Sequence, residues 1–186
     1  MNNLKLLAVD DELVSRSFLE RKLKNAGYDI ESAENGNEAI DLISKSYFDV
    51  VITDLIMPGD VDGIGVLEAA KANYSGKTEV ILITAHASVD SAVEAMKKGA
   101  SDYLQKPINF DELMFRLEKI GNVKALVKNA GDLREAMDVT EMNAAQTIQD
   151  LEIKVFQLQN KLYEINKVLS DYDIDASERV RIALGI

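Results

Sequence analysis

The sequence contains no cysteine. Disulfide bonds and thiolate metal sites are therefore excluded, and the fold depends on packing alone. Basic residues are outnumbered by acidic ones, 21 against 32, which gives a formal net charge of -11. Proteins that bind a nucleic-acid backbone show a basic patch or stripe, so we expect no direct nucleic-acid partner. No apolar run approaches the length that spans a bilayer, and the stretch 4–9 is too short for a signal peptide. We therefore expect a cytoplasmic protein.

Short apolar runs alternate with helical patterns from residue 4 to residue 120. The runs predict strands over 4–9, 29–33, 47–53, 80–83 and 101–105. The helical spacing predicts helices over 12–26, 63–72 and 111–120, and around 39–43 and 88–98. This strict alternation of strand and helix predicts a parallel sheet with helices on both faces.

Reactive side chains stand at the ends of four of these strands: Asp10, Asp11, Asp54, Thr84 and Lys106. Because parallel strands end at one edge of a sheet, we expect these side chains to lie together there. Three carboxylates crowded at one edge repel one another, and they stay ionised together only beside a cation. Oxygen ligands with positions left for water suit Mg²⁺.

Asp54 is the centre of this predicted site because it ends the β-branched run at 50–53, which has the character of a buried strand. A metal ion would neutralise an incoming phosphoryl group, and Lys106 and the hydroxyl of Thr84 would take its remaining oxygens. Asp54 would then accept that group as the nucleophile. Each residue taken alone has an ordinary structural explanation, such as a helix cap or a strand stop, and it is their coincidence that favours the site.

Four short motifs contain these residues: Val-Asp-Asp-Glu at 9–12, Asp54 with Met57-Pro58, Thr84-Ala85, and Asp-Tyr-Leu-Gln-Lys-Pro at 102–107. Together they resemble the receiver domain of bacterial two-component response regulators. The resemblance covers about residues 1–121, and the segment Thr-Ala-His-Ala-Ser at 84–88 is similar to receivers of transcriptional activators that carry an ATPase module.

The resemblance implies a flavodoxin-like (βα)5 doubly wound fold with strand order 2-1-3-4-5. It also implies phosphorylation of Asp54 by a histidine kinase or a phosphotransfer protein, in a signalling protein that is no enzyme beyond slow self-dephosphorylation. The implied Mg²⁺ ligands are Asp10, acting through water, Asp11, Asp54 and the carbonyl of Ile56. Thr84 and Lys106 would contact the phosphoryl group, and Tyr103 matches the aromatic switch of the family.

The chain departs from the family pattern in the loop after the acceptor, where three residues instead of two separate Pro58 from Asp62-Gly63. Ile56 and His86 occupy positions that influence the hydrolysis of the acyl phosphate in this family. His86 is the only histidine, and it is expected in an exposed loop, so we do not expect a histidine phosphotransfer protein.

A coiled-coil seam is predicted in the C-terminal part, where apolar residues recur at alternating steps of three and four. The seam consists of Ile148, Leu151, Val155, Leu158, Leu162, Ile165 and Leu169. A similar series of residues runs from Leu126 to Ala144 upstream. The step from Ala144 to Ile148 is four residues where three are due, which is a stutter in the heptad pattern. We expect breaks in the helix at Gly121 and Gly131, and a last short helix at about 176–184 after the acidic residues 171–173. The predicted domains are therefore a receiver at 1–121, a helical linker or coiled coil at 122–171 and a helical tail at 172–186.

The seam favours a homodimer through 122–171, and an intramolecular helical hairpin is the alternative. No DNA-binding or ATP-binding motif follows, so either the output is protein binding or the chain is the front portion of a longer transcriptional regulator. Two other classes remain open. One is a phosphatase with an aspartyl-phosphate intermediate, which would need a second Asp where Ile56 stands. The other is a constitutive coiled-coil scaffold whose receiver is inert.

Overall fold

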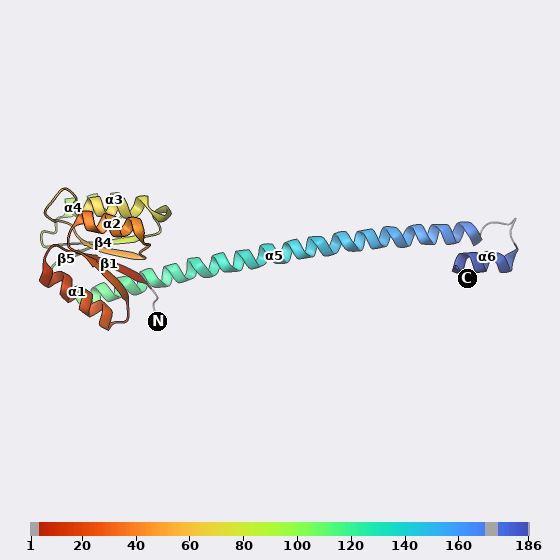
Figure 1. Ribbon diagram of the computed structural model, residues 1–186, viewed down its shortest axis with the longest axis horizontal. Coiled ribbons are helices and arrows are strands. Elements are labelled where there is room, and N and C mark those ends of the chain that lie inside the picture. The colour runs from red at the N-terminus through yellow and green to blue at the C-terminus, as the bar shows by residue number, and fades with distance from the viewer. Residues whose placement is uncertain (1–3, 170–174, 186) are drawn as a thin grey trace. The chain divides into compact units, whose positions relative to one another are not determined.

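The computed structural model describes residues 4–169 and 175–185 (Figure 1). The chain divides into two units, Met1–Val127 and Lys128–Ile186. Among the described residues, no helix combines the length and the hydropathy that crossing a membrane requires.

The first unit is built on a parallel sheet whose strand order is β2-β1-β3-β4-β5. The strands are β1 (Lys5–Val9), β2 (Asp29–Ala33), β3 (Val50–Asp54), β4 (Glu79–Thr84) and β5 (Asp102–Gln105). All four neighbouring pairs are parallel. The flavodoxin-like fold and its predicted strand order are therefore confirmed.

Helices cover both faces of this sheet (Figure 1). They are α1 (Leu13–Asn25), α2 (Gly36–Lys45), α3 (Gly63–Ala72), the 3-10 turn η1 (Tyr74–Gly76), α4 (Val89–Lys97) and the beginning of α5 (Phe110–Leu169). One core cluster joins the sheet to α1 and α5, and a second joins it to α2, α3 and α4. Every residue of β3 is buried, as expected for a central strand with two covered faces. Asp54 is its last residue, so the acceptor predicted from the sequence lies at the carboxyl end of the most enclosed strand.

Local signals in the sequence account for several of the helix boundaries. The side chain of Ser88 accepts a hydrogen bond from the main-chain N–H of Ser91 and caps α4, as predicted. Gly27 and Gly99 follow α1 and α4 with φ values of +88° and +93°, which residues with a β-carbon rarely adopt. The apolar residues of α1 are only partly buried. Leu19 is in the core, whereas Val14 is 74% exposed.

The predicted helix breaks at Gly121 and Gly131 are wrong, because α5 continues through both glycines from Phe110 to Leu169. A glycine costs a helix interior only about 1 kcal/mol relative to alanine, which neighbouring turns of a cooperative helix can offset. Gly121 is also buried within the first unit, so packing holds the helix together there. A hairpin folded at either glycine is therefore excluded.

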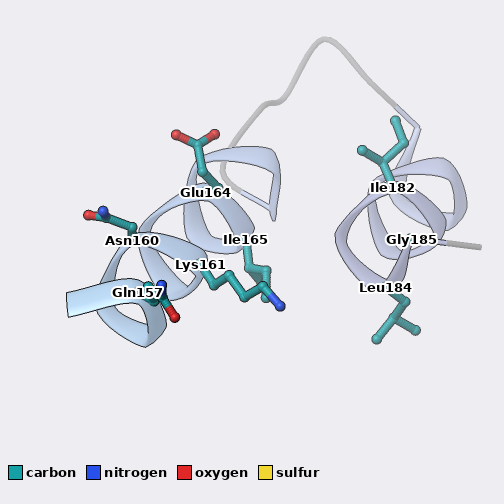
Figure 2. Close-up of a pocket in the computed structure, with 8 residues that line it drawn as sticks. All are labelled: Gln157, Asn160, Lys161, Glu164, Ile165, Ile182, Leu184 and Gly185. Atoms are coloured by element: carbon teal, nitrogen blue, oxygen red, sulfur yellow. The ribbon is translucent and has the colours of Figure 1, made fainter. Parts of the chain in front are cut away.

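The second unit contains the part of α5 from Lys128 onward and the short helix α6 (Ala176–Leu184), which confirms the last predicted helix. The seam side chains from Ile148 to Ile165 are exposed, with 57% for Leu151 and 60% for Leu158. The predicted acidic turn at 171–173 lies outside the described residues. Figure 2 shows an open groove between the last turns of α5 and α6, with Ile165 on one wall and Ile182 and Leu184 on the other.

The packing of α5 on the sheet gives a direct test of the fold. Leu117 is fully buried, whereas Phe115 on the same helix is 64% exposed. We expect Leu117→Ala to lower the free energy of unfolding of the full chain by about 2–5 kcal/mol, because it leaves a cavity in the core. Phe115→Ala is the matched control and should change it by about 0.5 kcal/mol or less. Urea unfolding measures both. Equal losses in the two variants would contradict the assignment of the buried face of α5.

Candidate functional site

Three carboxylates meet at the carboxyl edge of the sheet. Asp10, Asp11 and Asp54 each bring one oxygen into a group whose members lie within 4.8 Å of one another. The register explains this meeting, because Val9 pairs with Thr53 across β1 and β3, and Asp10 and Asp54 are the next residues on these adjacent strands. Asp10 and Asp54 are 5% and 8% exposed. Asp11 is exposed and faces solvent.

Lys106 places one positive charge against this group. Its Nζ lies 2.8 Å from Oδ2 of Asp10 and 2.5 Å from Oδ2 of Asp54. The residue follows β5, and its main-chain N–H donates to the carbonyl of Thr84 at 2.8 Å. Burial opposes the charged form of Lys106, but the hydrogen bonds to Asp10 and Asp54 outweigh it and raise the pKa of the ammonium group. Lys106 is therefore a permanent cation in the site at neutral pH.

The loop after β3 holds the carboxylate of Asp54 from its other side. Oδ1 of Asp54 accepts a hydrogen bond from the main-chain N–H of Ile56 at 3.0 Å. The first residue of α3, Gly63, lies so close that a β-carbon there would sit 2.2 Å from the carbonyl oxygen of Asp54. Only glycine fits this approach, and it lets α3 begin directly against the acceptor strand.

Asp10 is fixed by the start of α1. Its Oδ1 accepts a hydrogen bond from the main-chain N–H of Glu12 at 2.9 Å, and its carbonyl accepts one from Arg16 at 2.5 Å. Arg16 could not be predicted from the sequence, because nothing in its spacing from Asp10 distinguishes it from other basic residues on a helix. Asp10 therefore has both carboxylate oxygens engaged, and Asp11 is the more accessible of the pair.

Thr84 and Tyr103 lie on the strands next to this cluster. Thr84 ends β4 and is fully buried, and its hydroxyl accepts a hydrogen bond from the main-chain N–H of His86 at 3.1 Å. Tyr103 packs against the core on the side of α2, α3 and α4. Its hydroxyl lies 2.8 Å from Oγ of Ser91 on α4, a contact that the sequence analysis missed. The structure thus ties Tyr103 to α4 and not to the carboxylates.

The charges of the cluster suit a divalent cation. Three carboxylates face one ammonium group, so the site retains an excess of two negative charges when all are ionised. All candidate ligand atoms are oxygens, which fits Mg²⁺. A hollow lined by Asp11, Glu34, Asn35, Asn37, Pro58 and Gly59 adjoins the cluster and gives a route from solvent. Asp10, Asp11 and Asp54 would hold the ion, and none of these residues lines the groove of the second unit.

The fold and this site define a flavodoxin-like α/β protein with an acidic cluster at the carboxyl edge of its sheet. Residues 6–118 match the response regulator receiver domain. The chain belongs to this family, which confirms the resemblance seen in the motifs.

Relatives and solved structures agree with this assignment. The chain is 35% identical over 144 residues to a putative response regulator NtrX-like of Rickettsia felis, covering 76% of this chain and 30% of that protein. It is 39% identical over 118 residues to the transcriptional regulatory protein ZraR of Escherichia coli K12, covering 63% of this chain and 26% of that protein. The chain therefore spans less than a third of the length of these relatives.

Among solved structures, the receiver domain of the Francisella response regulator 1452 has a TM-score of 0.60 and 34% identity, covering 66% of this chain and 99% of that one. The response regulator TrrA of Thermotoga maritima, solved in complex with Mg²⁺ and BeF, has a TM-score of 0.56 and 34% identity, covering 63% of this chain and 98% of that one.

The carboxylate cluster predicts a measurable stabilisation by metal. We expect Mg²⁺ at a hundred times its dissociation constant to stabilise the full chain by about 2.7 kcal/mol, because the ion binds only the folded site. Asp11→Asn should remove most of this effect with little change in the metal-free protein, since Asp11 is exposed. Glu34→Gln is the control, because Glu34 lines the same hollow but is outside the cluster. Thermal unfolding with and without Mg²⁺ measures the effect, and equal stabilisation of wild type and Asp11→Asn would contradict it.

Proposed function

We propose that this chain acts as a two-component response regulator in which Asp54 accepts a phosphoryl group from a histidine kinase or a phosphotransfer protein, with Mg²⁺ as cofactor. The observation that supports it best is the setting of the Asp54 carboxylate, which is nearly buried, bound by Lys106 and clustered with two further carboxylates. The complex of TrrA with Mg²⁺ and BeF is consistent with such a site in a relative.

The transfer moves one phosphoryl group between two side chains. A carboxylate oxygen of Asp54 forms a bond to phosphorus while the bond from phosphorus to the imidazole nitrogen of the donor histidine breaks, and the electron pair of that bond stays with the imidazole. Bound Mg²⁺ would supply positive charge against the repulsion between carboxylates and phosphoryl group, held by Asp10, Asp11, Asp54 and the carbonyl of Ile56.

Lys106 and Thr84 would position the phosphoryl group once it is bound to Asp54. The ammonium group of Lys106 already contacts an oxygen of Asp54 at 2.5 Å, so it can bind a phosphoryl oxygen with only a small shift. Thr84 ends the neighbouring strand and pairs with Gln105 of β5, two residues after Tyr103, so movement of its hydroxyl would be felt on this strand. The hydrogen bond between the hydroxyl groups of Tyr103 and Ser91 connects β5 to α4, so it can pass this change on to α4. The proposed switch is therefore the surface formed by α4, β5 and α5.

The function is signalling and not phosphoester turnover. A phosphatase with an aspartyl-phosphate intermediate would need an acid two residues after the nucleophile, and Ile56 stands there with an apolar, 59% exposed side chain. The exposed seam on α5 supports a homodimer through residues 122–171 as the output, because an apolar heptad stripe is buried when a second helix packs on it.

Phosphoryl acceptance at Asp54 is tested directly with a small phosphodonor. We expect acetyl phosphate and Mg²⁺ to add one phosphoryl group to the wild-type chain, seen by intact mass spectrometry, and none to Asp54→Asn. Asp60→Asn is the control, because Asp60 is an exposed carboxylate in the following loop. Labelling of Asp54→Asn to the level of the wild type would overturn the assignment.

The homodimer is tested with two side chains of similar exposure on α5. Leu158 lies in the seam and is 60% exposed, whereas Phe156 lies off it and is 64% exposed. We expect Leu158→Glu to raise the dimer dissociation constant by about 100-fold or more, because each chain loses a buried leucine. Phe156→Glu should leave the constant nearly unchanged. Sedimentation of the full chain measures both, and a larger effect of Phe156→Glu would contradict the seam.

Sedimentation also distinguishes a receiver that controls dimerisation from a coiled-coil scaffold that dimerises constitutively. In the proposed function, beryllium fluoride with Mg²⁺ changes the association of the wild type but not that of Asp54→Ala. An identical wild-type dimer with and without beryllium fluoride would favour the scaffold and would contradict the coupling of Asp54 to the seam.

A further inference from the structure

Lys124 lies on α5 beyond residue 118, where the match to the receiver domain ends. Its ammonium group contacts three oxygens of the receiver body. Nζ lies 2.8 Å from the hydroxyl of Tyr47, 2.8 Å from the carbonyl of Lys77 and 3.2 Å from Oδ1 of Asp49. We call Tyr47, Asp49 and the carbonyl of Lys77 the lysine socket. An ammonium group has three N–H donors, so the lysine socket offers one acceptor for each of them.

The lysine socket is built into the amino ends of three strands. Oδ2 of Asp49 accepts a hydrogen bond from the main-chain N–H of Lys5 at 2.9 Å. The main-chain N–H of Asp49 donates to the carbonyl of Lys5, and its carbonyl accepts from the N–H of Glu79. Asp49 thus links the starts of β1, β3 and β4. The ring of Tyr47 meets that of Tyr74 edge to face, with centroids 5.3 Å apart, which restricts its position.

The contact is less exposed to solvent than an ordinary surface ion pair. The side chain of Lys124 is only 23% exposed, and that of Asp49 19%. Burial opposes the charge of Lys124, but its hydrogen bonds to Tyr47 and Asp49 outweigh burial and raise its pKa. The ammonium group also lies 5.4 Å from the centroid of the Tyr47 ring, within range of a cation–π interaction. Lys119 and Lys128, on the same helix, are exposed and provide a natural comparison.

We propose that Lys124 is a positioning residue that makes the turns of α5 up to Val127 a rigid part of the receiver unit. The helix is anchored earlier by the buried Leu113 and Leu117 and by the ion pair of Arg116 with Asp102. Lys124 extends this anchoring beyond the buried Gly121 to the following turn of the helix. The consequence for signalling rests on the proposed function. A change caused at Asp54 would then reach the later turns of α5 through a helix segment that is fixed to the receiver unit, and not through a bend at Gly121.

The test measures how well ordered residues 121–127 of α5 are relative to the receiver unit. It uses the full chain without any activator, so its outcome does not depend on phosphorylation. Because the chain lacks cysteine, Lys45→Cys on α2 and Val127→Cys on α5 give one pair of spin labels. Both sites are exposed. Dilution with unlabelled chain removes distances between copies. We expect a narrow distance distribution in the labelled protein and a clearly broader one after Lys124→Met, which keeps the apolar stem but removes the charge.

Matched variants separate positioning from a general loss of stability. Lys119→Met removes an exposed lysine of the same helix and should leave the distribution narrow. Tyr47→Phe removes one acceptor and keeps the ring, and it should broaden the distribution less than Lys124→Met does. Amide hydrogen exchange of residues 121–127 should quicken by about tenfold to a hundredfold in Lys124→Met, as expected for the loss of charged hydrogen bonds.

The fold is checked independently in each variant by Mg²⁺-dependent phosphorylation with acetyl phosphate and by circular dichroism, which Lys124→Met should leave unchanged. An unchanged distance distribution together with unchanged exchange at 121–127 would overturn the positioning role. Broadening to the same degree in Lys119→Met would overturn it as well, because it would show that any loss of charge on this helix has the same effect.

Discussion

Electrostatic repulsion among three carboxylates is the constraint on which the rest of the receiver unit depends. Asp10, Asp11 and Asp54 come together because β1 and β3 are adjacent and parallel, and Lys106 forms ion pairs with Asp10 and Asp54. Such a cluster is costly unless cations offset it. The surroundings of the cluster reduce its freedom to relax, since Arg16 and the start of α1 fix Asp10 while Ile56 and Gly63 hold the acceptor loop. The carboxylates are therefore held together, ready for a cation, by the same packing that forms the fold.

The sequence predicted the sheet and the carboxylate cluster because both depend on local patterns. Buried strands of a parallel sheet appear as apolar runs, and the residue that ends each run is automatically at the common edge. The contacts that escaped prediction join residues far apart in the chain, such as Tyr103 with Ser91 and Lys124 with Tyr47. Neither pair has a spacing that a single sequence could reveal, because their meeting is set by how helices pack on the sheet.

The two incorrectly predicted helix breaks show that local helix propensity alone does not decide where a helix ends. Gly121 and Gly131 are poor helix formers, and Asp132 with Glu135 has the form of a capping box, yet α5 passes through all of them. Each signal favours a helix end by only about 1 kcal/mol, and a long run of good helix formers on both sides outweighs it. Gly121 is also buried, so its packing in the receiver unit adds to the helix-forming preference of its neighbours. The helix is therefore continuous at Gly121 for both reasons.

Because α5 is continuous, the number of residues between Lys124 and the seam determines the helical phase of the seam along α5. Each residue inserted or removed after Lys124 turns the following helix by about 100° and moves it along its axis by about 1.5 Å. One deletion would therefore shift the helical phase of the seam along α5 by about 100°, while a change of seven residues would nearly restore it. Variants of the linker should therefore be compared by helical phase along α5 before they are compared by composition.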